Sequence, residues 1–306
     1  MFNTIIGHDK IKKQLENAIT NNNILHSYLF IGEEGIGKKL MAKELAKTIL
    51  CTSSNDKPCD ICKSCIEFNS NNNVNFQVID TEGSSIKIDQ IRNMQSKIAE
   101  KPVNSDHKVY IINDSELMTV EAQNCLLKTL EEPPQYITII LITSNENKIL
   151  NTIKSRCTKI YFNLLSEDEI KTILNGLNID NITNSYLQAC GGSIKKAILL
   201  KEKSEEYEQI DKIFDIIDKD NIVTFINNAN VIYENKDDIY NMLDYINIIL
   251  NNKAKEGINQ MAYANCIFIV EEVKKRLRAN GNFDMCIDYL LMNMWKEINS
   301  ERNSRN

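Results

Sequence analysis

The chain has 306 residues, of which 42% are hydrophobic and 25% are charged, as is typical of a globular protein with more than one domain. Its net charge of −6 at pH 7 argues against a free-standing nucleic-acid-binding protein, because it has no surplus of Lys and Arg to neutralise phosphates. No apolar stretch approaches the roughly 20 residues of a membrane span, and the N-terminus lacks the pattern of a signal peptide, so we expect a cytoplasmic protein.

The first predicted strand leads into a glycine-rich segment. Residues 27–31 are β-rich, and residues 38–50 have the apolar spacing of a helix. The segment between them has the pattern G-x-x-x-x-G-K, in which backbone N–H groups at a helix N-terminus bind phosphates. The residues that carry this pattern are Gly32, Gly35, Gly37 and Lys38. The sequence predicts a phosphate loop, with a glycine-rich turn that binds no ligand as the alternative.

The loop lacks one residue that a nucleotide hydrolase needs. Position 39 would be a Ser or Thr whose hydroxyl holds Mg²⁺, but the chain has Lys39. An ammonium group donates hydrogen bonds and carries positive charge, so it cannot coordinate a cation. We therefore expect the catalytic use of this loop to be impaired.

Four cysteines with the spacing of a metal site follow the predicted helix. Cys51, Cys59, Cys62 and Cys65 are separated by seven, two and two residues. Four thiolates at this spacing can close around one Zn²⁺, and in a reducing compartment a metal is favoured over disulfides. An iron–sulfur cluster of the ferredoxin type would need a further cysteine where the chain has Asn69. We predict a zinc module over residues 51–65, with a structural role and no open coordination position.

Further strands and helices alternate up to residue 162. The predicted strands are residues 76–79, 109–112, 138–143 and 159–162, and the predicted helices between them are residues 88–100 and 120–130. Nearly continuous apolar strands separated by helices indicate a parallel sheet that is covered on both faces. We therefore expect an α/β domain over residues 1–162.

A second metal-holding element is altered after the strand at residues 109–112. A nucleotide hydrolase would present two acids here, one to hold Mg²⁺ and one to orient the attacking water. This chain has Asn113 and Asp114. Asparagine brings no charge to Mg²⁺, and aspartate is one methylene shorter than the usual glutamate. Together with Lys39, this pair predicts a chain that does not hydrolyse nucleotide.

Two further basic positions are ambiguous from spacing alone. Arg156, in Ser155-Arg156-Cys157, follows the strand at residues 138–143 and a helical stretch, and a lone arginine is most often a surface group. Lys195, after a break at Gly191-Gly192, is equally compatible with an ordinary exposed lysine.

The strand pattern ends after Phe162. Ser166 and Glu169 have the spacing of a capping box that opens a helix. From there to the end the chain is predicted to be helical, and residues 285–298 carry a dense apolar face. We expect a small helical domain over residues 163–208 and a larger helical one over residues 209–306.

The motifs taken together resemble those of bacterial clamp-loader AAA+ subunits. The resemblance rests on the ordered segments Ile6-Gly7-His8, His26 to Gly32, the phosphate loop, the four cysteines, Lys108 to Ile112, Asn124 to Pro134 and Ser155-Arg156-Cys157. It runs in order to about residue 200, and beyond that point only the helical character and the length are similar. Its most specific parts are Leu-Leu-Lys-Thr-Leu-Glu-Glu-Pro-Pro and Ser-Arg-Cys.

This resemblance implies a RecA-like AAA+ domain, a small helical lid and a helical collar that joins subunits in a ring. It implies that Arg156 acts in trans as an arginine finger on ATP bound by a neighbouring motor subunit, where such fingers contribute roughly 10³–10⁵ in rate. The position of the family's ATP-sensing lid arginine is Lys195 in this chain, which weakens the case for a response to nucleotide.

Two subunit types of that family are candidates. The motor type (gamma/tau) keeps an intact phosphate loop and acidic pair. The delta-prime type commonly lacks working catalytic residues and keeps the arginine of Ser-Arg-Cys. Lys39 and Asn113, together with the length of the chain, favour the delta-prime type.

We therefore predict a non-hydrolysing subunit of the DNA polymerase III clamp loader. Its expected partners are the gamma/tau and delta subunits in a hetero-pentamer, the sliding clamp, and primed DNA through the complex, with no membrane involved. Zn²⁺ is the expected cofactor, and the sequence leaves ATP binding open. One alternative is an active ATPase motor with a non-standard Mg²⁺ shell. The other is a zinc-dependent DNA-binding module, and the net negative charge of the chain argues against it.

Overall fold

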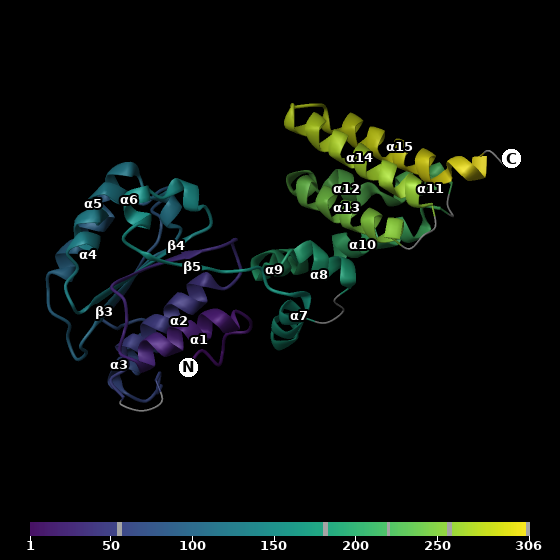
Figure 1. The fold of residues 1–306 in the computed structure, drawn as a ribbon. Helices are drawn as coiled ribbons and strands as arrows, with labels where there is room; N and C mark the ends of the chain where they lie inside the picture. The colour runs from purple at the N-terminus through teal and green to yellow at the C-terminus, as the bar shows by residue number, and fades with distance from the viewer. Residues whose placement is uncertain (54–56, 180–182, 219–220, 256–258, 304–306) are drawn as a thin grey trace. The chain divides into compact units, whose positions relative to one another are not determined.

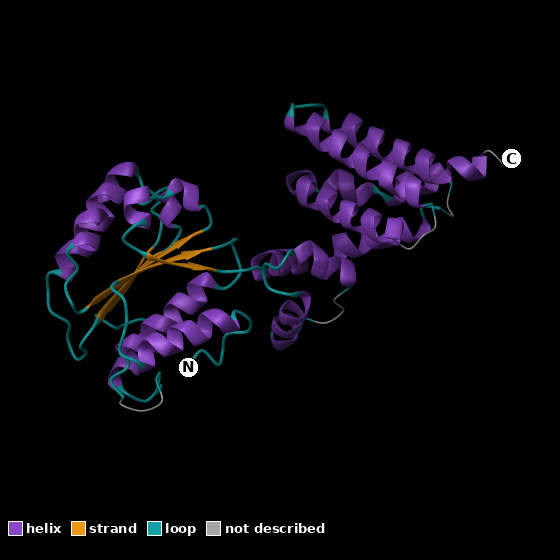
Figure 2. Ribbon diagram, in the orientation of Figure 1, coloured by secondary structure: helices purple, strands orange, loops and turns teal. Residues whose placement is uncertain are grey.

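The computed structural model describes residues 1–53, 57–179, 183–218, 221–255 and 259–303. The chain divides into two compact units (Figures 1 and 2). The first unit is Met1–Ile173 together with the short segment Gly192–Ile194. The second is Leu174–Gly191 together with Lys195–Asn306. The predicted division of the helical part at residue 208 stays a prediction.

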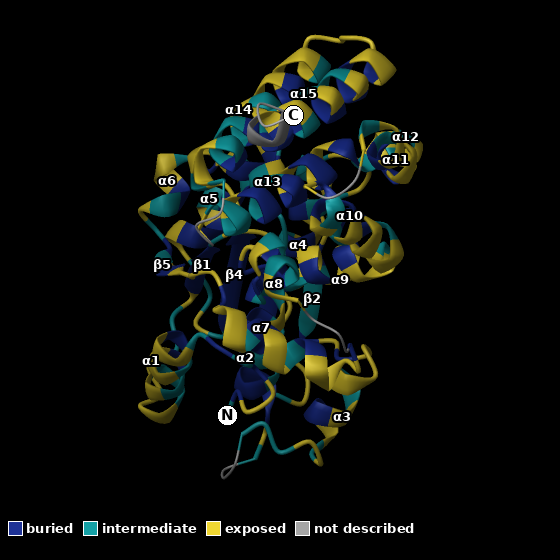
Figure 3. Cartoon of the chain, turned by 90° about the vertical axis from the view of Figure 1, so that its right-hand side faces the viewer, coloured by how far each residue is buried: buried dark blue, intermediate teal, exposed yellow. Residues whose placement is uncertain are grey.

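The first unit contains a five-stranded sheet in the order β2-β3-β4-β1-β5, in which every neighbouring pair is parallel. The strands are β1 (Ser27–Ile31), β2 (Phe76–Ile79), β3 (Lys108–Ile112), β4 (Ile137–Thr143) and β5 (Thr158–Tyr161). The predicted parallel sheet is confirmed, with strand ends that differ by at most one residue from the predicted ones. All seven residues of β4 are buried, so this strand is dark blue in Figure 3.

Helices cover both faces of the sheet. One face is covered by α1 (Asp9–Thr20), α2 (Lys38–Leu50) and α3 (Lys63–Asn69), and the other by α4 (Ile88–Ile98), α5 (Val120–Glu131) and α6 (Asn151–Lys154) (Figure 1). Successive side chains of a strand point to opposite faces. Phe30 of β1 therefore packs in the core under α1 and α2, whereas Leu29 packs in the core under α4 and α5. The sheet is thus buried on both sides.

Two α-helices of the first unit, α1 and α3, are not among the predicted elements. In α1, the buried residues Ile11 and Leu15 are four positions apart and form its inner face. The seven-residue α3 begins directly after Cys62, whose sulfur accepts a hydrogen bond from the Cys65 N–H and thereby caps the helix.

Short helices complete the first unit and connect it to the second. They are η1 (Ser115–Leu117), η2 (Glu146–Lys148) and α7 (Glu167–Gly176). The predicted capping box opens α7, because the Ser166 N–H donates to Glu169 Oε2 at 2.8 Å and the Glu169 N–H donates to Ser166 Oγ at 3.3 Å.

The elements after α7 are all helices, and apart from Ile194 at the start of α9 their described residues belong to the second unit. They are α8 (Asn184–Cys190), α9 (Ile194–Glu202), α10 (Ser204–Ile216), α11 (Ile222–Asn228), α12 (Asn230–Glu234), η3 (Lys236–Asp238), α13 (Ile239–Lys255), α14 (Gln260–Arg278) and α15 (Phe283–Asn303). The longest three pack in sequence, α14 lying against both α13 and α15. Within the part of the chain that the structure describes, no helix is long and apolar enough to cross a membrane.

Candidate nucleotide-binding loop, cysteine cluster and arginine

The glycine-rich loop lies between the end of β1 and the start of α2, as predicted. Gly35 and Gly37 have φ angles of 79° and 97°, which side chains other than glycine adopt only with strain. At Gly32 the constraint is space, because a Cβ there would lie 2.8 Å from the Phe162 carbonyl oxygen. The glycines are therefore needed for the shape of the loop in this chain.

Hydrogen bonds to five consecutive carbonyl groups, those of residues 32–36, hold this shape. The donors are Lys38 Nζ to Gly32 and Glu33 (2.5 Å each), Ser193 Oγ to Glu34 (2.8 Å), the Ile194 N–H to Gly35 (2.9 Å) and His8 Nε2 to Ile36 (2.7 Å). In a trans peptide the N–H points away from the C=O, so bonds to the carbonyls on one side also orient the N–H groups. The loop is fixed without a ligand.

Lys38, which would reach the terminal phosphates, is buried beneath this loop. Burial lowers the pKa of its ammonium group, and the carboxylates of Glu116 and Asp114 raise it in part. The surroundings of the loop are rich in acids, because Glu33 and Glu34 also act on Lys38. A phosphate that entered the loop would therefore meet several carboxylates beside Lys38.

Lys39 lies on the first turn of α2, and its ammonium group pairs with Asp80, which follows β2. The distance from Lys39 Nζ to Asp80 Oδ1 is 2.8 Å. The Asn113 side-chain amide donates to the same carboxylate oxygen at 2.9 Å and to Asp114 Oδ2 at 2.9 Å. Burial acts to raise the pKa of Asp80, but the hydrogen bonds from Lys39 and Asn113 hold it below its ordinary value. The four side chains form one connected network.

This network brings together the two positions that the sequence analysis treats as altered. Lys39 and Asn113 are 74 positions apart, the difference of their residue numbers, yet both bond Asp80. Asp114 faces acidic neighbours, since burial and then the carboxylates of Glu116 and Glu34 raise its pKa. No residue of this set supplies the hydroxyl that a metal ion would need at position 39.

Glu116 engages the end of β4 near the same loop. Its Oε1 accepts hydrogen bonds from the Ser144 N–H at 3.0 Å and from Ser144 Oγ at 2.5 Å. Burial acts to raise the pKa of Glu116, but these bonds from Ser144 lower it overall. Asp80, Glu116 and Ser144 could not be identified from sequence, because the partner of each is distant in the chain.

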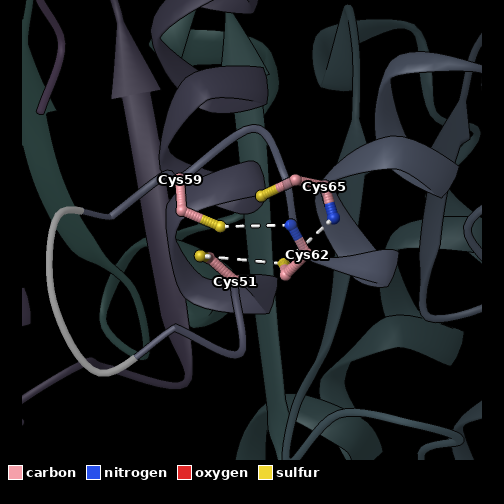
Figure 4. A group of neighbouring side chains, drawn as sticks. All are labelled: Cys51, Cys59, Cys62 and Cys65. Carbon is pink, nitrogen blue, oxygen red and sulfur yellow. Dashed lines mark hydrogen bonds between the residues drawn. The ribbon is translucent and has the colours of Figure 1, made fainter.

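The four predicted ligand cysteines lie together, from the residue after α2 to the first turn of α3 (Figure 4). Their sulfur atoms are all within 4.8 Å of one another, and the sulfurs of Cys51 and Cys62 are 4.0 Å apart. Four sulfurs at roughly 2.3 Å from a tetrahedral Zn²⁺ would lie roughly 3.8 Å apart, so a small contraction closes the site. The cluster therefore fits a metal ion with four thiolate ligands.

Backbone N–H groups point at two of these sulfurs. The Cys62 N–H donates to the Cys59 sulfur at 3.3 Å, and the Cys65 N–H donates to the Cys62 sulfur at 3.4 Å. Burial acts to raise the pKa of Cys62, but hydrogen bonds from Thr52 and from the Cys65 backbone lower it to about 6. Burial raises the pKa of Cys65 to about 12. Four adjacent thiolates repel one another unless a cation lies between them.

Arg156 lies between α6 and β5, and its guanidinium group is held within the first unit. Arg156 NH1 donates to the Thr152 carbonyl at 2.8 Å, and NH2 pairs with Glu131 Oε1 at 2.7 Å. The side chain is 33% exposed and that of Glu131 is 49% exposed. NH1 also donates to Ser155 Oγ at 3.4 Å. Glu131 is a partner that the sequence analysis does not identify.

Lys195 follows Ile194 on α9 and is exposed. It belongs to the second unit, whereas the two residues before it, Ser193 and Ile194, bond the phosphate loop in the first. The two residues before Lys195 therefore contact the loop. The assignment of Lys195 to the position of the ATP-sensing lid arginine stays a prediction.

Residues 7–166 match the family model described as "DNA polymerase III, delta subunit", which is slightly more than half of the chain. The chain is 28% identical to DNA polymerase III subunit delta-prime of Bacillus subtilis over 311 aligned positions, which cover 92% of this chain and 94% of the relative. It is 38% identical to DNA polymerase III subunit gamma/tau of Mycoplasma pneumoniae over 170 positions, which cover 56% of this chain and 25% of the relative.

Among solved structures, the chain is similar to a DNA polymerase III gamma subunit-related protein of Thermotoga maritima, with 18% identity and a TM-score of 0.46. That match covers 93% of this chain and 99% of the other. Relatives of both the delta-prime and the gamma type therefore match, and the chain spans only a quarter of the length of the gamma/tau relative.

Proposed function

The chain belongs to the DNA polymerase III delta-subunit family, a family of clamp-loader proteins, and from that premise we propose that it is a delta-prime-type subunit that does not hydrolyse ATP. In this proposal the first unit is a RecA-like AAA+ domain that keeps its phosphate loop as a structural element. The role of the subunit is to help a motor subunit open the sliding clamp and place it on primed DNA.

The observation that carries this proposal is the ion pair between Lys39 and Asp80. Phosphoryl transfer in this class of fold needs a metal ion that bridges the terminal phosphates, held by a hydroxyl at position 39 and an acid after β3. Here an ammonium group lies 2.8 Å from Asp80, and an amide, Asn113, takes the place of the acid. Hydrolysis would require a metal where the chain already has a cation.

Arg156 is proposed as the residue that acts on the neighbouring subunit. It is partly exposed, and its NH1 and NH2 groups have partners that leave further donors of the guanidinium group available. A guanidinium group placed against the terminal phosphate of ATP offsets the charge that develops during its transfer. The motor subunit would supply the ATP and the metal ion, and this chain would supply the arginine.

The cysteine cluster is proposed as a structural zinc site. Four thiolates with no water among the ligands are typical of structural rather than catalytic zinc. Cys51 ends α2 and Cys62 precedes α3, so the ion would tie the helix that follows the phosphate loop to the next one. Its contribution would be to the stability of the first unit.

The proposed partners are the gamma/tau and delta subunits in a hetero-pentamer, with a lid at residues 163–208 and a collar at residues 209–306 that joins the ring. A cytoplasmic location is part of the proposal, since the complex would act on chromosomal DNA.

The test is ATP hydrolysis by a clamp loader reconstituted from this chain with the gamma/tau and delta subunits of the same organism. The purified chain alone is expected to show no Mg²⁺-dependent hydrolysis. In the complex, Arg156→Ala should leave assembly intact and lower turnover in the presence of clamp and primed DNA by at least about tenfold, since fingers contribute roughly 10³–10⁵ at the site they serve.

Arg92→Ala is the matched control, because Arg92 is 63% exposed on α4 and pairs with Asp89 in its own helix. It should leave turnover unchanged. Robust hydrolysis by the chain alone would make it a motor subunit of the gamma/tau type, and unchanged turnover of the Arg156→Ala complex would remove the finger.

A further inference from the structure

Asp80, which the sequence pattern does not single out, lies at the centre of the network around Lys39. It follows β2 at the carboxyl end of the sheet, beside the end of β3, where Asn113 lies. One of its oxygens accepts from both Lys39 and Asn113, at 2.8 Å and 2.9 Å. A carboxylate at this edge, next to the position of the Mg²⁺-binding hydroxyl, has the chemistry of a divalent metal ligand.

The Lys39 ammonium group lies where an ion bound to position 39 would be needed. Lys39 is a first-turn residue of α2 directly after Lys38. In a complete phosphate loop this position is a Ser or Thr, whose hydroxyl contacts the metal beside the phosphates. In this chain the Lys39 side chain pairs instead with the carboxylate of Asp80. The ammonium group supplies both a positive charge and a hydrogen bond to Asp80.

We propose that the Lys39 ammonium group takes the place of the divalent cation at this site and excludes Mg²⁺. Once Lys39 is replaced by a residue with a hydroxyl, Asp80 becomes a ligand for Mg²⁺ that is bound together with a nucleoside diphosphate. This inference deepens the proposed non-hydrolysing role, because it gives the physical reason for the missing metal. It also means that the phosphate loop retains a metal site that a single substitution opens.

Two features of the structure make such a substitution informative. The side chains of Lys39 and Asp80 are 41% and 51% exposed, and an exposed ion pair contributes little to folding stability, so the Lys39→Thr variant is expected to fold. The loop itself is held by hydrogen bonds to its carbonyls that do not involve Lys39. The substitution therefore removes the cation and adds a hydroxyl without altering those contacts.

The experiment measures binding of a fluorescent ADP analogue to the full chain with and without millimolar Mg²⁺. The buffer contains no chelator, so that metal bound by the cysteine cluster is retained. Wild type is expected to show no effect of Mg²⁺ on ADP binding. In Lys39→Thr, Mg²⁺ should tighten ADP binding by at least about tenfold, a coupling within the usual range between two ligands that bind together.

Two further variants identify the cause of that gain. Lys39→Thr combined with Asp80→Asn should lose it, because the proposed carboxylate ligand is gone. Lys43→Thr, which removes a positive charge that also acts on Asp80 from the next turn of α2, should behave as wild type. Thermal unfolding of each variant serves as the measure of intact folding.

The inference is overturned if Lys39→Thr shows no Mg²⁺ effect, including the case in which it binds no ADP, or if the gain survives Asp80→Asn. Mg²⁺-dependent ADP binding by wild type also overturns it. These outcomes are separate from a failure of the proposed function, which would appear as ATP hydrolysis by the chain alone or as an Arg156→Ala complex with normal turnover.

Discussion

At the scale of single residues, the phosphate loop has its full set of shaping contacts, but positions 39 and 113 lack the side chains that hold a metal ion in a nucleotide hydrolase. Lys38 retains the contacts that shape a phosphate loop, whereas the next residue, Lys39, pairs with Asp80. A motif that matches at three of its four defined positions, Gly32, Gly37 and Lys38, would suggest an active site if position 39 were ignored. The identity of one residue at the end of the motif therefore carries more functional information than the glycines.

Glu131 sets a further expectation at this scale, because it holds the proposed finger. Its carboxylate is 2.7 Å from Arg156, and it competes with a phosphate on a neighbouring subunit for the same guanidinium group. Glu131→Gln keeps the shape and removes the charge. We expect it to lower the ATP concentration for half-maximal turnover of the reconstituted loader by up to about fivefold, the equivalent of the ~1 kcal/mol of a surface ion pair.

Glu132→Gln is the control for that variant, since Glu132 is the adjacent exposed carboxylate. A rise in the required ATP concentration for Glu131→Gln would contradict the competition and indicate that the carboxylate aligns Arg156 for its task. The measurement is steady-state ATP hydrolysis at increasing ATP, with clamp and primed DNA present.

Residue identities allowed part of the site to be predicted from sequence. Lys39, Asn113 and the four cysteines were identifiable because each stands within a pattern whose expected chemistry is known. Asp80 and Glu131 were not, since nothing near them in sequence indicates a partner. Lys39 is 41 positions from Asp80, and Arg156 is 25 positions from Glu131, as their residue numbers give, so only the fold brings them together.

At the scale of elements, the strands were predictable because a parallel sheet covered on both faces requires continuous apolar runs. The short α3 was not, because its start is determined by sulfur contacts. Cys62 both caps α3 and belongs to the cluster, so the same atom serves the helix and the proposed metal. A seven-residue helix with few buried side chains has little apolar periodicity to detect.

Replacement of Cys62 tests the cluster at this scale. Cys62→Ser removes one of four ligands and the sulfur cap of α3, so we expect loss of bound zinc and a lower stability of the first unit. The measurement is zinc content of the purified protein by elemental analysis, with thermal unfolding as the second readout.

Cys125→Ser is the matched control, because Cys125 lies on α5 outside the cluster and is only partly buried. Its zinc content should equal that of wild type. Retention of zinc in Cys62→Ser, together with an unchanged melting temperature, would contradict the assignment of a structural site.

At the scale of the whole molecule, the cysteine cluster belongs to only one of the two compact units. Removal of the metal by a chelator should therefore lower the melting temperature of one calorimetric transition and leave the transition of the helical unit in place. Bound metal is expected to add roughly 4 kcal/mol to the free energy of unfolding of the first unit, and each kcal/mol shifts the melting temperature by about 2–4 °C. The expected fall in melting temperature is therefore roughly 10 °C. Equal shifts of all transitions would show that the units unfold together.

The borders of these units depend on tertiary contacts that the sequence pattern does not show. The change from strands to helices after Phe162 is visible in sequence, but the first unit continues to Ile173 and takes in Gly192–Ile194 as well. That segment belongs to the first unit because of its hydrogen bonds: Leu165 donates to the Gly192 carbonyl, and Ser193 and Ile194 donate to the phosphate loop. Tertiary contacts of three residues leave no periodic signal.

The return of Gly192–Ile194 has a consequence for how the protein responds to proteolysis. The chain passes between the two units three times, after Ile173, Gly191 and Ile194. A protease that cuts between Leu174 and Gly191 therefore leaves a C-terminal fragment that contains Ser193 and Ile194, which hydrogen-bond the phosphate loop of the N-terminal fragment. A single nick would be visible on a denaturing gel while the two fragments still migrated together under native conditions.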